Sequence, residues 1–187
     1  DLAHNLSLFD DAQIRYIGLL SDFKREDVVQ DIDYLISVSG PEPSRTTFER
    51  QLLEQAKELE GRVIVVLGKP EKKELVKNDG IEIYSYVEGR ERDVLMNRAK
   101  LVVSRSGYST LMDLAELGKK ALFVPTPGQT EQEYLARYHR ERGTFFSVSQ
   151  RTMDLKRDTE MAAAYRGVVC PHRTAESVRR FMEVVLG

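Results

Sequence analysis

"VVSRSGYSTLMDLAELGKKALFVPTP", from Val102 to Pro127, decides the fold. A short apolar run leads into the turn Arg105-Ser106-Gly107, an amphipathic helical pattern follows at once, and a second apolar run ends in Pro-Thr-Pro. This order of strand, helix and strand is typical of a parallel sheet. The turn has almost no side-chain bulk at Ser106 and Gly107, which indicates that something approaches that backbone closely.

Outward from this stretch, short apolar runs alternate with helical patterns along the whole chain. We expect helices over the intervening segments, and the charged segment "GKPEKKELVKNDG" is interpreted as a solvated loop or short helix. The pattern predicts an α/β fold with a Rossmann-like, doubly wound parallel sheet and right-handed crossovers. The predicted strands are Ile14–Gly18, Tyr34–Ser39, Arg62–Gly68, Ile81–Val87, Leu101–Ser104, Ala121–Pro125 and Thr144–Ser149.

The composition excludes several classes of protein. The net charge of −2 argues against a nucleic-acid-binding domain that works by neutralising phosphates. No apolar run reaches the roughly 20 residues of a membrane span, so no transmembrane segment is expected. The single cysteine and the three scattered histidines show no metal-ligand spacing, so no metal is expected. The chain opens without Met or a signal-peptide pattern, and we expect a fragment or a processed chain.

The turn after the fifth predicted strand is a candidate anion site. Ligands of open parallel sheets bind beyond the carboxyl ends of the strands. Free amides at a helix start, assisted by the helix dipole, bind anions, and Gly107 has no Cβ to obstruct a phosphate. The hydroxyls of Ser106, Ser109 and Thr110 add donors, and Leu111, Leu114, Ala115 and Gly118 form an apolar stripe. Thr110, Asp113 and Glu116 form a polar stripe, and a carboxylate on it could accept hydrogen bonds from ribose hydroxyls.

A plain structural interpretation stays open for this turn, because glycine often serves only the turn and early acidic residues often serve only the helix dipole. Neither the dinucleotide fingerprint G-x-G-x-x-G nor the P-loop motif is present. The next connection, "PTPGQTEQEYLA", again joins a strand end to a helix start. Gln129, Glu131 and Gln132 supply amides and a carboxylate, which suit sugar hydroxyls. The alternative is a capping box, with Thr130 as the N-cap and Glu133 three residues later.

The stretch "SRSGYSTLMDLAELGKKALFVPTPGQTEQEYLARYHRERG" resembles the donor-binding half of GT-B-fold glycosyltransferases, and most closely glycosyltransferase family 28. That family includes the bacterial enzyme that adds N-acetylglucosamine to a lipid-linked peptidoglycan precursor. The resemblance covers Arg105–Gly143 and extends through the order of elements from Tyr34 to the C-terminus. It implies a linker and incoming strand over residues 1–32, after an N-terminal domain outside this sequence, and a nucleotide-sugar donor-binding domain over residues 33–187.

The resemblance also implies a role for individual residues. Ser106, Gly107, Ser109, Thr110, Ser39 and Gly40 would contact the donor diphosphate, and Asp113 the ribose. Tyr86 would stack on the base and the Val87 backbone would contact its pyrimidine edge, although Tyr86 could equally belong to the core. Gln129, Glu131 and Gln132 would contact the sugar.

Two loops depart from the family pattern. Pro41 and Pro43 remove amide donors from the loop after Ser39-Gly40. Related enzymes can also carry a basic residue after the "YIG" strand, where this chain has Ser21 and Asp22.

The resemblance implies transfer of a sugar, by default N-acetylglucosamine, from a UDP-sugar to an acceptor hydroxyl, without a metal or other cofactor. The general base and the acceptor site, for a lipid-linked or glycan acceptor, would belong to the N-terminal domain, so no catalytic residue is assigned and this chain alone would transfer little. The implied location is cytoplasmic, with a peripheral position at the inner membrane face, through the N-terminal domain, as an alternative.

Three other interpretations stay open. A nucleotide-sugar 2-epimerase shares the GT-B-like architecture, although no histidine lies near the proposed site in the sequence. A non-catalytic donor-binding subunit could act with a separate acceptor-domain chain. A flavodoxin-like or regulatory domain could use the turn for a different anion.

Overall fold

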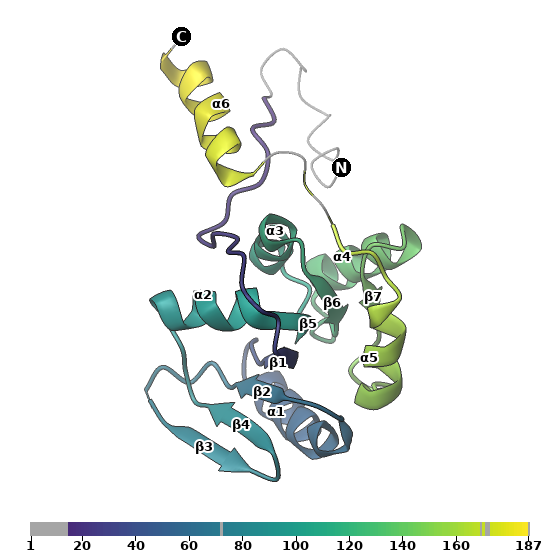
Figure 1. The fold of residues 1–187 in the computed structure, drawn as a ribbon. Helices are drawn as coiled ribbons and strands as arrows, with labels where there is room; N and C mark the ends of the chain where they lie inside the picture. The colour runs from purple at the N-terminus through teal and green to yellow at the C-terminus, as the bar shows by residue number, and fades with distance from the viewer. Residues whose placement is uncertain (1–14, 72, 169, 171–172, 187) are drawn as a thin grey trace. The chain divides into compact units, whose positions relative to one another are not determined.

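The computed structural model describes residues 15–71, 73–168, 170 and 173–186. The chain divides into two compact units: Ser21–Cys170 forms one, and the other described residues, which include the last helix, belong to the second. Figure 1 shows the elements of the first unit as a twisted sheet with helices on both of its faces. The candidate site lies in this unit.

The first unit contains seven strands, five α-helices and one short 3-10 helix among its described residues. The strands are β1 (Ile32–Ser37), β2 (Val63–Val66), β3 (Leu75–Asn78), β4 (Ile81–Tyr84), β5 (Ala99–Ser104), β6 (Lys120–Phe123) and β7 (Phe146–Ser147). The helices are α1 (Ser44–Gln55), η3 (Ala56–Glu58), α2 (Gly89–Arg98), α3 (Tyr108–Leu117), α4 (Thr130–Glu141) and α5 (Leu155–Ala163).

The sheet has the strand order β3-β4-β2-β1-β5-β6-β7. All neighbouring strands run parallel except β3, which pairs antiparallel with β4. Helices α2, α3 and α4 cover one face, and α1 and α5 cover the other (Figure 1). The chain thus adds β2, β3 and β4 on one side of β1 and then β5, β6 and β7 on the other, which is the doubly wound arrangement that the sequence predicts.

Burial on both faces explains why the central strands are almost wholly apolar. Ile36, Val65, Val103 and Leu122 lie in one core cluster, together with Phe48 from α1. Each of these side chains is almost fully removed from water. Burying an aliphatic or aromatic side chain contributes about 1.5–3 kcal/mol, so this cluster is the main stabilising feature of the unit.

The structure corrects two predictions about strands. The predicted strand Ile14–Gly18 is wrong over its described residues, since Arg15–Gly18 belongs to no strand, and Ile14 lies outside the described residues. The charged segment interpreted as a loop or short helix instead contains β3, whose four residues are all exposed. Asp79 and Gly80 form the turn between β3 and β4, with φ values of 50° and 80°. An Asp-Gly turn with two positive φ angles is the usual connection of a tight hairpin.

Helix α3 packs on the sheet through a face that differs in part from the predicted stripe. Leu111 and Leu114 are buried as expected. Glu116 and Leu117 are buried too, whereas Ala115 is half-buried and Gly118 is exposed. The prediction that Glu116 belongs to the polar stripe beside the turn is therefore wrong. A helix has 3.6 residues per turn, and the buried arc here extends towards Leu117 rather than towards Gly118.

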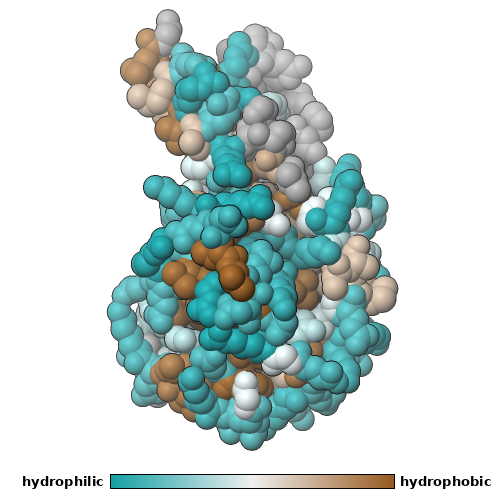
Figure 2. Space-filling view, in the orientation of Figure 1, coloured by the Kyte–Doolittle hydropathy of each residue, from teal (hydrophilic) through white to brown (hydrophobic). Residues whose placement is uncertain are grey.

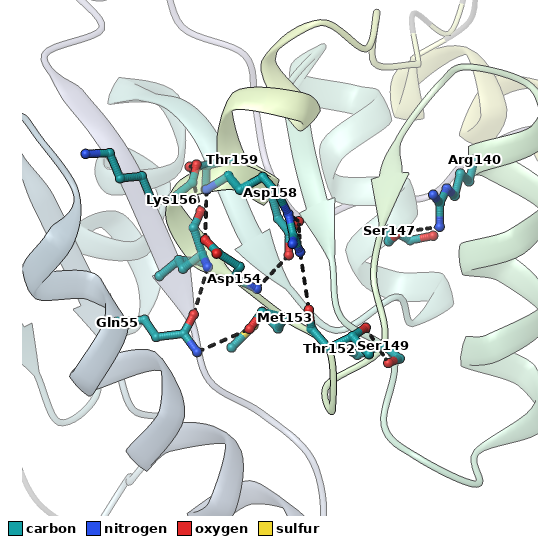
Figure 3. Close-up of polar contacts among 12 residues, drawn as sticks. Gln55, Arg140, Ser147, Ser149, Thr152, Met153, Asp154, Lys156, Asp158 and Thr159 are labelled. Carbon is teal, nitrogen blue, oxygen red and sulfur yellow. Dashed lines mark hydrogen bonds and ion pairs between the residues drawn. The ribbon is translucent and has the colours of Figure 1, made fainter.

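Side chains from two elements fix the start of α5. The Asp154 backbone amide donates to Asp158 Oδ2 at 2.8 Å. Gln55, at the end of α1, accepts from the Leu155 amide at 2.7 Å and donates to the Met153 carbonyl at 3.3 Å (Figure 3). These bonds satisfy backbone groups that a helix start leaves without partners, and they tie α1 to α5 on one face of the sheet.

The second unit contains residues from Arg15 to Leu20 and α6 (Thr174–Leu186). At Gly18, where φ is +116°, a Cβ would lie 2.5 Å from the hydroxyl oxygen of Ser177, so only glycine fits there. Apolar residues appear in brown on α6 in Figure 2. No helix within the described part of the chain is long and apolar enough to cross a membrane.

Candidate functional site

The two strand-to-helix loops singled out in the sequence lie side by side at the carboxyl edge of the sheet. β5 and β6 are parallel neighbours, with Ser104 opposite Phe123. Beyond the strands the pairing continues, since the Val124 amide donates to the Ser104 carbonyl at 2.9 Å. The predicted placement of Ser104–Gly107 and Pro125–Gln129 at the same edge is confirmed.

A cavity of about 330 Å³ opens at this edge. We call it the donor pocket, because the family resemblance assigns several of its lining residues to the sugar donor. Its walls come from β1, β2 and β5, from the segments before β1 and after β1, β2 and β4, and from helices α2 and α3. The lining residues are Phe23, Leu35, Ser37, Val38, Ser39, Val66, Gly68, Tyr86, Val87, Arg92, Leu95, Met96, Val102, Ser104, Ser109, Thr110 and Asp113.

Six of the predicted site residues line the donor pocket: they are Ser39, Tyr86, Val87, Ser109, Thr110 and Asp113. Tyr86 and Val87 follow β4 instead of ending it, because the strand stops at Tyr84. An aromatic ring, three hydroxyls and one carboxylate thus share one cavity although they come from three separate segments. Their gathering follows from the parallel topology, which directs all the strand ends to one edge.

Asp113 is the carboxylate of the donor pocket. Burial raises its pKa, while a hydrogen bond from Ser21 and the nearby positive charge of Arg92 act in the opposite direction. The Ser21 hydroxyl donates to Asp113 Oδ1 at 2.6 Å. One carboxylate oxygen is therefore held in place, and Oδ2 is available to accept a hydrogen bond from a ligand.

The start of α3 provides backbone donors. Gly107 is the N-cap residue of α3, and no side chain caps this end of the helix. The ladder of helical bonds begins with the Leu111 amide, which donates to the Gly107 carbonyl at 3.0 Å. A Cβ placed on Gly107 would meet nothing within 4 Å. The helix start therefore combines its dipole with open space in front of the glycine, as an anion site requires.

Ser106 and Gln132 do not line the donor pocket. The Ser106 side chain is fully buried, and its hydroxyl donates to the Gln132 carbonyl at 2.8 Å. Gln132, which is 8% exposed, accepts from the Thr126 amide through Oε1 at 2.8 Å. These bonds join the β5–α3 loop to the start of α4. The Ser106 hydroxyl thus donates within the protein, and the Gln132 side-chain oxygen already accepts one bond, so the side-chain nitrogen is the group that can donate to a ligand.

The remaining predicted sugar contacts lie on the surface at the start of α4. Gln129 is the N-cap residue and makes no side-chain cap, so the suggestion that Thr130 is the N-cap is wrong. Glu133 Oε1 accepts from the Gly128 amide at 2.9 Å, which lies before the N-cap, so the bond differs from the Glu133-to-Thr130 bond of the expected capping box. Glu131 is exposed. Gln129 and Glu131 do not reach the donor pocket, and their assignment to a sugar stays a prediction.

Arg105 was not singled out in the sequence, yet its side chain is at the centre of this edge. Only 2% of Arg105 is exposed, and its guanidinium stacks 3.7 Å from the ring centre of Phe48. Burial lowers its pKa to about 10, so it stays charged at neutral pH. No carboxylate in the described part of the chain pairs with it. A basic residue directly after a buried strand was the only sequence signal for this feature.

One buried atom of Arg105 and one buried atom of Thr126 lack hydrogen-bond partners. Arg105 Nε and Thr126 Oγ1 form no hydrogen bond with any described residue. A Cβ on Gly40 would lie 3.8 Å from the first and 3.5 Å from the second, so both atoms face the β1–α1 loop. Gly40 has φ of +114°, which favours glycine. Unsatisfied buried donors are rare in proteins, and an anion or water oxygen would complete this group.

Arg92 and Phe23 are further pocket residues that sequence reasoning missed. The Arg92 guanidinium lies 4.4 Å from the ring centre of Phe23. Arg92 is the one basic residue that lines the cavity, and Asp113 is the one acid. Neither could be placed there from the sequence, because Phe23 precedes the first strand and Arg92 belongs to a charged helix start.

A doubly wound sheet with a pocket at its carboxyl edge defines this unit as a Rossmann-like α/β domain. Residues 44–157 match the model of the glycosyltransferase family 28 C-terminal domain, and the chain belongs to that family. The α/β fold and the family expected from the sequence are confirmed.

The chain is similar to curated UDP-N-acetylglucosamine–N-acetylmuramyl-(pentapeptide) pyrophosphoryl-undecaprenol N-acetylglucosamine transferases. The identity is 31% over 101 residues of the Acidiphilium cryptum protein, covering 49% of this chain and 27% of the relative. It is 49% over 41 residues of the Methylobacterium radiotolerans protein, covering 22% of this chain and 11% of the relative. The matches thus span about a quarter or less of the length of these relatives.

Two solved structures share the fold. The chain aligns with MurG of Acinetobacter baumannii at a TM-score of 0.55 and 20% identity, covering 85% of this chain and 51% of that one. It aligns with the glycotransferase of kitacinnamycin at a TM-score of 0.61 and 14% identity, covering 94% and 46%. Identities this low show the architecture alone.

Proposed function

We propose that this chain is the donor-binding domain of a glycosyltransferase and that the donor pocket holds a UDP-sugar. One observation carries the proposal: the pocket places the Asp113 carboxylate, the Tyr86 ring and the start of α3 around a single cavity. A nucleoside diphosphate needs a partner for each of its ribose, base and phosphates. The names of the relatives, which include UDP-N-acetylglucosamine, support this nucleotide.

Each part of the donor has a matching group in the chain. The diphosphate would lie at the start of α3, near Gly107 and the hydroxyls of Ser109 and Thr110, where dipole and amides favour negative charge. The ribose hydroxyls would donate to Asp113 Oδ2. The base would stack on Tyr86. The sugar would extend towards Gln132, whose amide nitrogen can donate to a hydroxyl.

The reaction follows from this placement. An acceptor hydroxyl attacks the anomeric carbon, the bond from that carbon to the diphosphate oxygen breaks, and the nucleoside diphosphate leaves with the electron pair. Its negative charge grows in the transition state. Fixed donors at the start of α3 stabilise that charge more as it develops, which accelerates the step.

The acceptor and the general base would come from a second domain, as the family resemblance implies. The donor pocket has a carboxylate but no histidine among its lining residues, and Asp113 is engaged with Ser21. This chain alone would then bind donor and transfer little. The absence of a metal requirement, the acceptor class and a cytoplasmic location stay predictions.

Calorimetric titration with UDP tests the proposal, with UMP, GDP and ADP as comparisons. UDP should bind more tightly than UMP, because the second phosphate adds contacts at α3, and more tightly than the purine nucleotides. Equal affinity for all four ligands, or none for UDP, would overturn the proposal. The result would then favour a domain that uses the turn for a different anion.

A further inference from the structure

A second cavity, of about 480 Å³, lies between α4 and the segment that follows β7. We call it the arginine pocket. It shares no lining residue with the donor pocket. Its lining residues are Pro125, Pro127, Glu133, Ala136, Arg137, Arg140, Ser147, Val148, Ser149, Gln150 and Arg151.

The charges around this cavity are unbalanced. Arg137, Arg140 and Arg151 line it, and Glu133 is the one acidic residue among its lining residues. Glu133 already accepts a hydrogen bond from the Gly128 amide. None of the three arginines forms an ion pair within the described part of the chain, whereas Arg90, Arg157 and Arg179, which are also exposed, each pair with an acidic side chain. The cavity therefore carries a net positive charge that the protein does not neutralise.

Arg140 is held in position. Its Nη1 donates to the Ser147 carbonyl at 3.0 Å, as Figure 3 shows, and its guanidinium lies 4.9 Å from the ring centre of Phe146. The contact occupies one of its five N–H donors. A guanidinium fixed in this way loses little rotational freedom when it binds a ligand, and its free edge is available for a planar, bidentate contact.

The buried guanidinium of Arg105 adds a second layer of positive charge behind the cavity wall. It donates to the Pro125 carbonyl at 3.0 Å and to Gln150 Oε1 at 2.8 Å, and both of these residues line the cavity. Gln150 Nε2 in turn donates to Gln51 Oε1 at 3.0 Å, so its orientation is fixed. Because a buried charge is poorly screened, Arg105 raises the potential in the cavity in front of it.

Four of the lining residues are apolar: they are Pro125, Pro127, Ala136 and Val148. Ser149 also lines the cavity, and its hydroxyl forms a hydrogen bond of 2.9 Å with Thr152 Oγ1. This combination suits a ligand with a strongly anionic group and an adjoining uncharged part. Three guanidinium groups exceed what one carboxylate can use, whereas a phosphoryl group carries about two charges and three acceptor oxygens.

We propose that the arginine pocket is a second anion site, separate from the donor pocket, which binds a phosphoryl group. This inference goes beyond the proposed function, because none of its residues is assigned to the donor. The phosphoryl group could belong to a soluble molecule or to a lipid headgroup. The shared chemistry is the contact between phosphate oxygens and Arg137, Arg140 and Arg151.

Inorganic pyrophosphate is the first probe, in the presence of saturating UDP so that the donor pocket is occupied. Binding is followed by the side-chain Nε–H signals of arginine in nuclear magnetic resonance spectra. The double variant Arg137→Gln/Arg151→Gln should weaken pyrophosphate binding at least tenfold, and raised salt should weaken it further. Arg50→Gln, which removes an exposed arginine from α1, should leave it unchanged.

Vesicles distinguish the two sources of phosphate. Co-sedimentation with phosphatidylglycerol vesicles that is lost in the double variant, but kept in Arg50→Gln, would identify a lipid headgroup. Loss of pyrophosphate binding without any vesicle binding would identify a soluble ligand. Equal binding of both probes to the double variant and to Arg50→Gln would overturn the proposal. The affinity for UDP, measured on the same variants, should not change, so this result is independent of the donor pocket.

Discussion

The Ser21 hydroxyl donates a hydrogen bond of 2.6 Å to Asp113 Oδ1. Related enzymes can carry a basic residue in the segment where this chain has Ser21. The structure gives this segment a different part: it orients the one carboxylate of the donor pocket. Since the same bond opposes the rise in the pKa of Asp113, Ser21 also helps to keep that carboxylate ionised.

Ser21→Ala should therefore raise the pKa of Asp113 further. If ribose hydroxyls donate to the ionised carboxylate, UDP affinity falls as pH drops through that pKa, and the fall should begin at a higher pH in the variant. Calorimetry with UDP at a series of pH values below neutral measures this. Ser149→Ala removes a hydroxyl outside the donor pocket and serves as the control. Superimposable pH profiles for Ser21→Ala and Ser149→Ala would contradict the prediction.

Gly107→Val should abolish UDP binding and leave the domain folded. At φ of −80° and ψ of 157°, the backbone at Gly107 suits any residue, and a Cβ there meets no protein atom within 4 Å. The added side chain would instead fill the space where a phosphate approaches α3. Circular dichroism checks the fold and calorimetry the binding. A folded variant that binds UDP normally would remove the main physical support for the donor pocket.

Asp113→Asn should weaken UDP binding less than Gly107→Val, because it changes the ribose contact and leaves the start of α3 intact. A lost hydrogen bond to a charged group costs about 1.5–3 kcal/mol, which is roughly tenfold to more than a hundredfold in affinity. The same titration ranks the two variants. The reverse order would show that α3 contributes less than Asp113 does.

Gln132→Ala should have two effects. It removes the acceptor for the buried Thr126 amide, so the free energy of unfolding should fall by about 1–3 kcal/mol. If the amide nitrogen contacts the sugar, the affinity for UDP-N-acetylglucosamine should also fall more than the affinity for UDP. Denaturant unfolding measures the first effect and paired titrations the second. Equal losses for both ligands would limit Gln132 to a structural role.

His139 should make the domain less stable in mild acid. Thr144 Oγ1 donates to the His139 carbonyl, so Nδ1 of His139 donates to Thr144 Oγ1, and the buried Nε2 has no partner among the described residues. Burial lowers the pKa of His139 from 6.5 to about 4. The unfolded chain binds a proton between these values and the folded chain does not, so stability is full above pH 6.5 and is lost as pH falls towards 4. The whole difference corresponds to about 3 kcal/mol.

The measurement is denaturant unfolding as pH is lowered from about 7 to about 5, a range in which an unperturbed histidine titrates. His139→Gln cannot titrate and should lose less stability than the parent chain over this range, even though its stability at neutral pH is lower. Parallel losses in both proteins would assign the acid sensitivity to other groups.

Sequence reasoning predicted the central strands of the sheet because apolar runs buried on both faces leave a strong pattern. The strand β3 (Leu75–Asn78) was not predicted, because an exposed edge strand needs no apolar residues. The one available signal was the Asp79-Gly80 pair, which marks a tight hairpin. The linker strand was a false positive, because "IRYIG" is apolar enough for a strand yet has no neighbour to pair with among the described residues.

The donor pocket was predictable to the extent that topology alone determines it. Parallel strands bring Ser39, Tyr86 and Asp113 to one edge whatever their side chains do. The orientation of a side chain depends on its tertiary neighbours, and nothing local in the sequence shows that Ser106 bonds to Gln132. Arg105 was missed for the same reason, as its burial depends on Phe48 and Gln150.

The hydrogen bond from Ser106 to Gln132 couples two loops that follow consecutive strands. Their mutual order is established when the chain folds, so a ligand that touches both loops has little loop entropy to remove on arrival. The same bond means that a substitution in one loop also affects the conformation of the other loop. Substitutions on either side of this bond should combine non-additively in a double-mutant cycle, even where only one of the two residues contacts the ligand.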